Sequence, residues 1–478
     1  MKVYCTCLLL LAFCSLIAAK ENGATTPNIV LILADDLGWS DVAYQGGDLV
    51  ETPHIDALAK SGTAFSRAYA MPVCTPSRAA LLTGKHAARL HMTIWSEGAL
   101  QGPKTRKLLQ AEALHDLPHA ETTLAKHLQN KGYLTALVGK WHLGDAGHFP
   151  ETHGFDVNVG GNHWGAPQTF FWPYSGSGFY GNEFRYVPGL PFGNDGEYLT
   201  DRLTDEALKV IDRAGEQPFF LYLAHYAPHI PVEAKAEDIA YFTKKLKPAM
   251  HHQNATYAAM VKSLDDSVGR IVEHLEKRGM TDNTILIFAS DNGGYIGVDR
   301  KSKQSVATTN NYPLRSGKGS CYEGGIRVPL IVKWPGVTTA GTSISEPVII
   351  TDIFHTLADA QKFTLQEEFP NDGLDLRSLL LNPQTSLERE ALYFHFPHYY
   401  ATTTPVSAVI AGHWKLLKYY EEDRLELYDL NKDPSESKNV ASEHPQKAKV
   451  LLQKLQRWIK EQGANMPNQN PYFRKRNP

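Results

Sequence analysis

Cysteine is scarce in this sequence of 478 residues, and neither sign of charge is in clear excess. Three of the five cysteines fall in the first 14 residues, so the remaining chain, with only Cys74 and Cys321, lacks a disulfide framework. The 48 lysines and arginines against 51 acidic residues give a net charge of −3, which excludes a general basic field that attracts nucleic acid. A binding site for an anion must therefore be local.

Long hydrophobic runs are also lacking. The apolar run from Val3 to Ile17 is shorter than the roughly 20 residues that span a bilayer, and small residues follow it. We therefore expect residues 1–19 to be a signal peptide, cleaved near Ala19, and the protein to be secreted or periplasmic without a transmembrane anchor. A lipid anchor at Cys14 is the weaker alternative, because the preceding Phe13 is bulky where such processing requires a small residue.

Short apolar segments alternate with amphipathic ones over the first two thirds of the chain. Asn28–Ala34 is a continuous run rich in β-branched residues, typical of a strand buried on both faces. The same pattern recurs in Leu134–Val138, Phe219–Ala224, Thr284–Ala289 and Arg327–Val332. Helical spacing marks Thr122–Lys131 and Tyr257–Arg278. This alternation predicts an α/β fold with a mostly parallel central sheet flanked by helices, and functional residues at the carboxyl ends of its strands.

The pattern changes beyond about Pro383. Segments typical of short antiparallel strands follow at Tyr393–Phe396, Ser407–Ile410, Lys415–Tyr419 and Glu426–Tyr428, before a final helix at Pro445–Gln462. We expect a main domain over residues 25–385 and a smaller C-terminal subdomain, an antiparallel sheet plus helix, over residues 386–478. Within the main domain, Gly160–Gly196 follows neither period and is predicted to be a long loop that shapes a cleft.

Acidic and amide side chains follow two of the predicted strands. Asp35 and Asp36 come directly after the first strand, and Asp291 and Asn292 come after Thr284–Ala289. Hard oxygen ligands of this kind suit Ca²⁺ or Mg²⁺, and adjacent carboxylates are costly unless a cation neutralises them. The alternative is a helix cap and an ordinary turn. Because both pairs stand at strand ends, the sequence favours a metal site.

The segment Cys74-Thr75-Pro76-Ser77-Arg78 places a thiol, a helix-initiating proline and a guanidinium within one turn. A helix from Pro76 to Thr83 is predicted to aim its unsatisfied N–H groups back at Cys74, where an anion would be held. The alternative for Cys74 is a small buried hydrophobic residue at a helix start.

Cations and imidazoles follow other predicted strands. Lys140 and His142 come directly after Leu134–Val138, two residues apart, and His229 follows Phe219–Ala224. His225 is the rival to His229, and we expect it to be structural. Lys318 lies in a glycine-rich segment, Arg315-Ser316-Gly317-Lys318-Gly319-Ser320. A packed histidine and a solvated loop lysine are the ordinary alternatives for these residue types.

Together, these motifs resemble those of the sulfatase family, the formylglycine-dependent type I sulfatases of the alkaline phosphatase superfamily. The likeness runs from Asn28 to roughly Pro335 and, more weakly, to about Val440. Five motifs occur in the family order, and their joint occurrence is far more specific than any single one. The resemblance implies an alkaline-phosphatase-like fold and an arylsulfatase-like enzyme that hydrolyses sulfate esters.

In that family, the cysteine of the Cys-x-Pro-Ser-Arg motif is oxidised to formylglycine, an aldehyde whose hydrate is the nucleophile. The resemblance assigns this modification to Cys74 and an orienting, charge-balancing role to Arg78. It also implies a formylglycine-generating or sulfatase-maturing enzyme as a partner. Cys321 then remains a packed thiol, while a disulfide between Cys74 and Cys321 stays open as the structural alternative.

The resemblance assigns the remaining roles residue by residue. Lys140 and Lys318 would bind sulfate. His142 would take a proton from the second hydroxyl of the hydrate, and His229 would protonate the leaving alcohol. One divalent cation, usually Ca²⁺ with Mg²⁺ as the alternative, would be bound by Asp35, Asp36, Asp291 and Asn292 together with residue 74.

We expect the substrate to be a sulfated polysaccharide or its oligosaccharides. Aromatic side chains of the loop Trp164–Tyr180 would pack on sugar rings. Further candidates for this cleft are His91, Trp95, His163, His395 and His398. Two alternatives stay open: a phosphoester or phosphonate hydrolase of the same superfamily, and a catalytically retired glycan-binding protein.

Overall fold

The computed structural model describes residues 26–100, 106–179, 183–365, 369–370 and 372–473. The predicted signal peptide, residues 1–19, lies outside this range, so its cleavage and the export of the protein stay predictions. Within the described residues, no helix combines the length and apolar character needed to cross a membrane.

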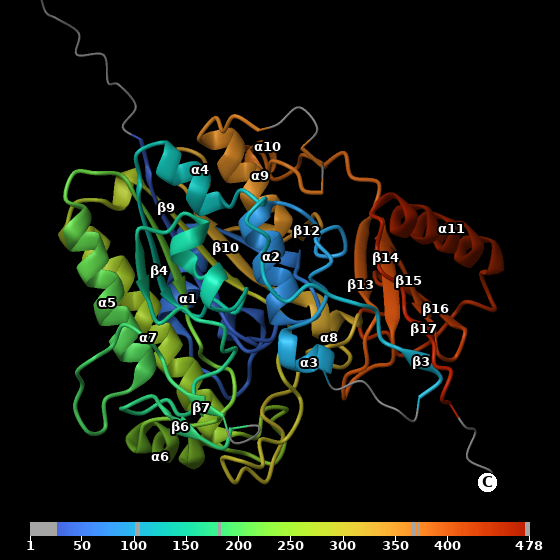
Figure 1. Cartoon of the computed structure of the whole chain (residues 1–478), viewed down its shortest axis with the longest axis horizontal. Helices are drawn as coiled ribbons and strands as arrows, with labels where there is room; N and C mark the ends of the chain where they lie inside the picture. The colour runs from blue at the N-terminus through green and yellow to red at the C-terminus, as the bar shows by residue number, and fades with distance from the viewer. Residues whose placement is uncertain (1–25, 101–105, 180–182, 366–368, 371, 474–478) are drawn as a thin grey trace, which may run out of the picture.

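A nine-stranded sheet forms the centre of the larger part of the molecule (Figure 1). Its order is β11-β2-β10-β9-β1-β8-β4-β5, and β12 pairs with β2. The bounds are β1 Asn28–Ala34, β2 Thr63–Tyr69, β4 Leu134–Gly139, β5 Val157–Val159, β8 Phe219–Ala224, β9 Thr284–Ser290, β10 Arg327–Lys333, β11 Thr342–Ile344 and β12 Val348–Ile349. The strands β9, β1, β8, β4 and β5 are parallel, which confirms the predicted mostly parallel sheet.

Strand β10 runs antiparallel to both of its neighbours, β9 and β2. A parallel neighbour requires a crossover, usually a helix, that returns the chain to the starting edge of the sheet. The chain between β9 and β10 carries only the single-turn helix α8 (Glu323–Ile326) and stays at the carboxyl edge of β9. The sheet is therefore mixed at this side.

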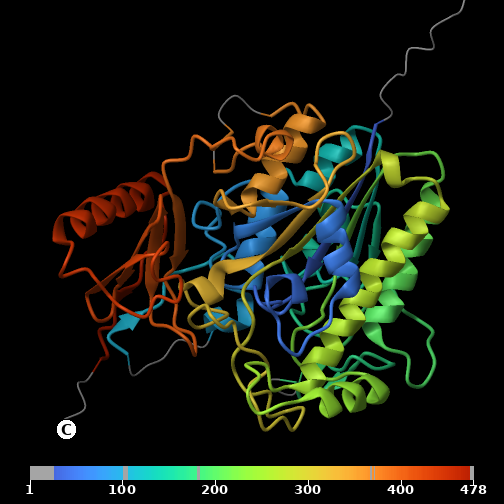
Figure 2. The same ribbon diagram turned by 180° about the vertical axis from the view of Figure 1, so that it is seen from behind.

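Two helical layers cover the sheet, and the side chains of β1 alternate between them. Ile29, Leu31 and Leu33 pack in one core with residues of α2, α4 and α9. Val30 and Ile32 pack in the other core with residues of α1, α5 and α7. The helix bounds are α1 Pro53–Ser61, α2 Cys74–Thr83, α3 Ser96–Leu100, α4 Leu124–Asn130, α5 Leu199–Ala214, α6 Ala236–Lys245, α7 Ala255–Lys277, α9 Thr351–Ala360 and α10 Arg377–Leu381. The long helix α7 is seen more fully from behind, in Figure 2, than in the view of Figure 1.

The C-terminal region forms a second, smaller sheet beside the main one (Figure 1). Its strands are antiparallel and follow in chain order, β13 Leu392–Phe396, β14 Val406–Ala411, β15 Trp414–Tyr419 and β16 Arg424–Asp429. Helix α11 (Pro445–Glu461) covers this sheet through Leu451, Leu455 and Trp458. The predicted antiparallel sheet plus helix is therefore present, while a domain boundary at residue 385 stays a prediction.

The stretch 160–196 is mostly irregular in its described residues and contains only the two-residue strands β6 (Gly176–Ser177) and β7 (Phe184–Arg185). A second pair of two-residue strands, β3 (Leu108–Leu109) and β17 (Asn468–Gln469), joins the segment after α3 to the C-terminal end of the described chain. Both short ladders lie in segments that reach the functional site.

Candidate active site

Side chains that follow different strands meet at the carboxyl edge of the main sheet. Because β1 and β9 are parallel neighbours, the residues after them share one edge. The backbone N–H of Asp36 donates to Asp291 Oδ1 at 3.1 Å, and Asn292 Nδ2 donates to Asp36 Oδ1 at 2.7 Å. The backbone of Asp36 has a φ of 64°, a left-handed conformation that is uncommon for residues other than glycine and is enriched at functional sites.

Helix α2 begins at Cys74, two residues earlier than the Pro76 start that the sequence predicts, with Val73 as its N-cap. Pro76 still fits, because N–H groups of the first turn have no intrahelical acceptor. Cys74 is buried at 2% exposure, and burial raises the pKa of its thiol, although Lys140 and Lys318 partly offset this. A thiol with a raised pKa is a weak nucleophile.

Three buried cations pair with the three carboxylates of this edge. Arg78 Nε lies 2.9 Å from Asp291 Oδ2, and Lys140 Nζ lies 2.7 Å from Asp35 Oδ2. Lys318 Nζ lies 2.8 Å from Asp36 Oδ1. Taking such charges out of water costs several kcal/mol each, so a cluster of this kind is retained for something other than stability.

The carboxylates differ in their preference for charge. Burial alone would raise the pKa of Asp36, but Lys318 and His229 lower it to about 2. The pKa of Asp35 rises to about 8, because burial and the neighbouring carboxylates outweigh Lys140 and Arg78. A divalent cation at this position would restore the charged form of Asp35.

The donor set fits a hard cation. Oδ1 of Asp35 and Oδ1 of Asn292 are buried, and neither has a hydrogen-bond partner among the residues that the structure describes. Ligand atoms of Asp35, Cys74 and Asp291 lie within 4.8 Å of one another. Oxygen atoms in this number and of this kind match the preference of Ca²⁺ or Mg²⁺.

His142 lies in the turn after β4 and, like Cys74, lines a cavity at this edge of the sheet. Its backbone is left-handed, with a φ of 61°, and Thr75 Oγ1 donates to its carbonyl oxygen at 3.0 Å. Neither ring nitrogen has a hydrogen-bond partner in the described part of the chain. Burial and then the positive charge of Lys140 hold the pKa of His142 well below its usual value, so this side chain is a neutral base.

The imidazole of His229 has a defined tautomer. Its Nδ1 lies 2.7 Å from the carbonyl oxygen of Ile230, which can only accept, so Nδ1 carries the proton. Its Nε2 therefore accepts from Lys318 Nζ at 3.0 Å. Burial and Lys318 hold the pKa of His229 well below its usual value. The rival His225 is fully buried with Nε2 on Ser267 Oγ at 2.9 Å, as expected for a structural residue.

Several of the side chains described above line a cavity of about 460 Å³. Its floor contains Asp36, Cys74, His142, His229 and Lys318. Its walls include aromatic and basic side chains, namely Trp95, Arg106, Phe179, Arg185, Tyr295, Tyr399 and Tyr400. Lys318 is tied to the C-terminal segment, because Thr402 Oγ1 donates to its carbonyl oxygen at 2.8 Å.

Four of the five additional residues predicted for the cleft lie elsewhere, and among these five Trp95 alone lines the cavity. Tyr180 lies outside the described residues; from 164–179 the lining residues are Gly165, Ala166 and Phe179. His395 is buried between Ser407 Oγ and the carbonyl of Asn465, and His398 is buried against Thr93 Oγ1. His91 and His163 are also absent from the lining. The prediction was wrong for these four because residue type does not reveal the direction of a side chain.

Sequence reasoning also missed the arginines and tyrosines of the walls. No local motif marks the segments that contain Arg106, Arg185, Tyr399 and Tyr400. They reach the cavity through the loop 160–196, the segment after α3 and the connection between β13 and β14.

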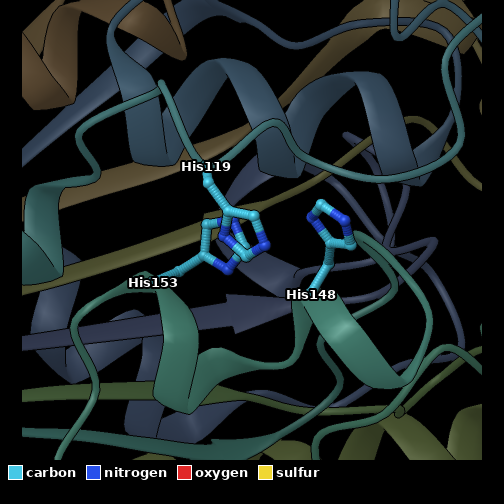
Figure 3. Close-up of side chains that lie close together, drawn as sticks. All are labelled: His119, His148 and His153. Carbon is cyan, nitrogen blue, oxygen red and sulfur yellow. The ribbon is translucent and has the colours of Figure 1, made fainter.

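His119, His148 and His153 form a histidine cluster (Figure 3). None of the three lines the cavity. The rings of His119 and His148 are stacked with centroids 4.2 Å apart, and Nδ1 of His148 and Nε2 of His153 both lie within 3.0 Å of the Leu117 carbonyl. Ring lone pairs lie in the ring planes, so nearly parallel rings do not direct them at one point. This cluster supports the turn after β4, since Trp141 Nε1 donates to the His148 carbonyl at 2.8 Å.

Cys74 and Cys321 are both free thiols in the structure, so the disulfide alternative is not realised there. Cys321 has no exposed surface, and burial raises the pKa of its thiol to about 12. It is the packed thiol that the sequence predicts.

Two family models match this chain. The family model described as Sulfatase matches residues 27–362, and the N-sulphoglucosamine sulphohydrolase C-terminal model matches residues 317–464. The chain therefore belongs to the sulfatase family. It is a sulfuric ester hydrolase with an alkaline-phosphatase-like fold.

Individual relatives cover most of the chain. A sulfatase of Formosa agariphila is 31% identical over 93% of this chain and 91% of its own length, and human N-acetylgalactosamine-6-sulfatase is 34% identical over 77% and 68%. The solved structure of Ps i-CgsB in complex with k-i-k-neocarrahexaose aligns with a TM-score of 0.76 and 32% identity over 94% of both chains. A phosphonate monoester hydrolase of Agrobacterium radiobacter, 19% identical with a TM-score of 0.62 over 92% of this chain and 96% of its own, shares the fold.

Proposed function

We propose that this sulfatase hydrolyses sulfate esters of sulfated polysaccharides or their oligosaccharides. The supporting observation is the 460 Å³ cavity, which combines a cationic, imidazole-bearing floor with aromatic walls. Aromatic faces pack against the C–H faces of sugar rings, and the volume exceeds what a sulfate group alone requires. The carbohydrate in the complex of the 32% identical neighbour supports the same substrate class.

Cys74 is the proposed site of conversion to formylglycine by a formylglycine-generating or sulfatase-maturing enzyme. When present, the hydrated aldehyde supplies one hydroxyl that attacks sulfur and a second whose deprotonation releases sulfate. The raised pKa of the unmodified thiol supports this assignment, because the thiol itself is a poor nucleophile. The first turn of α2 adds N–H groups and the positive end of its dipole at the same position.

One divalent cation, Ca²⁺ with Mg²⁺ as the alternative, would be held by Asp35, Asp36, Asp291 and Asn292 together with residue 74. The cation would supply charge neutralisation for the sulfate oxygens. The orphaned oxygens of Asp35 and Asn292 support the assignment.

The ionisable side chains divide the remaining work. Lys318, which lines the cavity, and the fully buried Lys140, which donates to Asp35, offset the charge of the sulfate. His142, neutral and with unpartnered nitrogens, accepts the proton of the second hydroxyl. The hydrogen-bonded pair of Lys318 and His229 delivers a proton to the leaving alcohol oxygen. Arg78 orients the floor, because it also donates to the carbonyl of Lys140 at 3.0 Å.

Two measurements test this function. Mass spectrometry of the tryptic peptide Ala68–Arg78, from protein made with a maturing enzyme, should show a loss of about 18 mass units from Cys74, the difference between thiol and aldehyde. The same protein should cleave p-nitrophenyl sulfate and sulfated oligosaccharides faster than p-nitrophenyl phosphate, and Cys74→Ala should abolish turnover. A preference for the phosphate ester would support a phosphoester hydrolase, and binding of glycan without turnover by matured protein would support a retired enzyme.

A further inference from the structure

The walls of the active-site cavity carry two guanidinium groups that the proposed reaction does not use. Arg185, on β7, is only 5% exposed and still lines the cavity. Its guanidinium carbon lies 4.4 Å from the ring centroid of Trp164 and 4.8 Å from that of Phe179. Contacts of this kind hold the guanidinium group in place.

Arg106 reaches the same cavity from a different segment. Its guanidinium carbon lies 4.2 Å from the ring centroid of Tyr399, a residue of the connection between β13 and β14. Its backbone is anchored, because Asn470 Nδ2 donates to its carbonyl oxygen at 2.7 Å beside the β3–β17 ladder. Both arginine side chains are therefore positioned before any ligand binds, which reduces the entropy lost on binding.

The charges of the cavity lining leave a positive wall. Asp36 pairs with Lys318 on the floor, and Glu97 Oε1 is 3.4 Å from Arg185. Arg106 has no carboxylate within 4.0 Å among the residues that the structure describes. Because the chain as a whole has a net charge of −3, this wall is a local feature. A neutral sugar would not compensate this positive charge, whereas an anion would.

We propose that the substrate carries a second anionic group, a sulfate or a carboxylate on the same or the adjoining sugar, which Arg185 and Arg106 bind while the scissile sulfate occupies the floor. Guanidinium groups bind both kinds of anion through paired N–H donors. Trp95 and Tyr400, which both line the cavity, are in contact with ring centroids 5.7 Å apart at 81°. This inference rests on the proposed function and restricts it to polyanionic glycans.

The test compares substrates within each variant of the matured, metal-loaded enzyme. The measured quantity is kcat/KM for a disulfated disaccharide divided by kcat/KM for p-nitrophenyl sulfate, which carries one anionic group. In Arg185→Gln and in Arg106→Gln this ratio should fall about 10-fold or more, as expected for loss of a charge-assisted hydrogen bond. Arg424→Gln, which removes an arginine stacked on Tyr419 in the C-terminal sheet, should leave the ratio unchanged.

A variant that is expected to raise the ratio distinguishes the proposal from simple misfolding. Glu97 competes with a substrate anion for Arg185, so Glu97→Gln should lower KM for the disulfated substrate and raise the ratio. Replacing the second sulfate by a uronate distinguishes the two anions, since the one that is recognised shows the larger response to Arg185→Gln. If the ratio is unchanged in both arginine variants, whether both activities fall together or neither does, the inference is overturned.

The outcome is separable from that of the proposed function. If matured enzyme does not hydrolyse sulfate esters, the proposed function fails at once. Calorimetry of Cys74→Ala with the disulfated disaccharide then still measures the role of the arginines, and an affinity that Arg185→Gln does not weaken overturns the inference.

Discussion

The Nε atom of Arg78 donates to Oδ2 of Asp291 at 2.9 Å, and neither side chain has any exposed surface. The two residues are 213 positions apart in the sequence. Their contact joins the first turns of α2 to the end of β9, so it fixes the position of Cys74 relative to the carboxylates. The candidate nucleophile and the candidate metal ligands therefore belong to one rigid frame.

Replacing Arg78 by glutamine should destabilise this frame. Removing one partner of a buried ion pair leaves the other charge uncompensated and costs about 3–5 kcal/mol in the free energy of unfolding. Urea unfolding monitored by circular dichroism measures this loss. Arg457→Gln is the matched control, because Arg457 is 57% exposed and its pair with Glu390 should contribute at most about 1 kcal/mol. Equal losses in both variants would contradict the interpretation.

Gly165 leaves the room that the imidazole of His142 occupies. A Cβ atom at residue 165 would overlap Cε1 and Nε2 of that ring. Gly165→Ala should therefore displace His142 and lower kcat about 10- to 100-fold, because a shift of about 1 Å in a catalytic group has effects of this size. Steady-state kinetics on p-nitrophenyl sulfate measures it. Gly147→Ala, where a Cβ meets nothing within 4 Å, is the control, and similar kcat values in the two variants would refute the prediction.

Removal of the metal should lower the stability of the protein, because the carboxylates of Asp35, Asp36 and Asp291 then lie close together without a bound cation. Chelation should lower the Tm of the native protein and added Ca²⁺ should restore it, because Ca²⁺ at 100 times its Kd adds about 2.7 kcal/mol to the free energy of unfolding. In Asp35→Asn the response to Ca²⁺ should shrink strongly. Differential scanning calorimetry tests both effects, with exposed Asp195→Asn as the control; an undiminished Ca²⁺ response in Asp35→Asn would exclude it as a ligand.

A buried histidine near this edge should make stability depend on pH. His252 Nε2 lies 3.1 Å from Asp41 Oδ1 and its Nδ1 lies 2.7 Å from Asp48 Oδ1. Burial opposes the imidazolium, but these two carboxylates raise the pKa of His252 to about 9. The resulting stabilisation is complete below the unfolded pKa of about 6.5 and is lost as the pH rises through about 9.

The free energy of unfolding of the native protein should therefore exceed that of His252→Gln most at about pH 6. This excess should shrink by roughly 3 kcal/mol between pH 6 and pH 9.5, the equivalent of the 2.5-unit rise in pKa. Urea unfolding at several pH values measures it, and His413→Gln, at a partly exposed position, should show no such trend. A difference between native protein and His252→Gln that stays constant with pH would disprove the assignment.

Local patterns predicted the elements of the fold well where they are long or fully buried. Phe219–Ala224 and Asn28–Ala34 have the predicted bounds, because a continuous apolar run specifies a strand buried on both faces. The long amphipathic helix, predicted at Tyr257–Arg278, is α7, Ala255–Lys277. Helix α5 was missed, although its burial follows helical spacing, because no single motif marked it.

The sequence by itself determined the family, several of the buried strands and long helices, and which charged residues follow the predicted strands, because hydrophobic period and motif are properties of neighbouring residues. Only the tertiary structure decided that β10 runs antiparallel, that His395 and His398 are buried away from the cavity, and that Arg106 and Arg185 line one cavity. The physical reason is that strand direction and side-chain orientation depend on contacts between residues that lie far apart in the chain, and these contacts leave no local pattern.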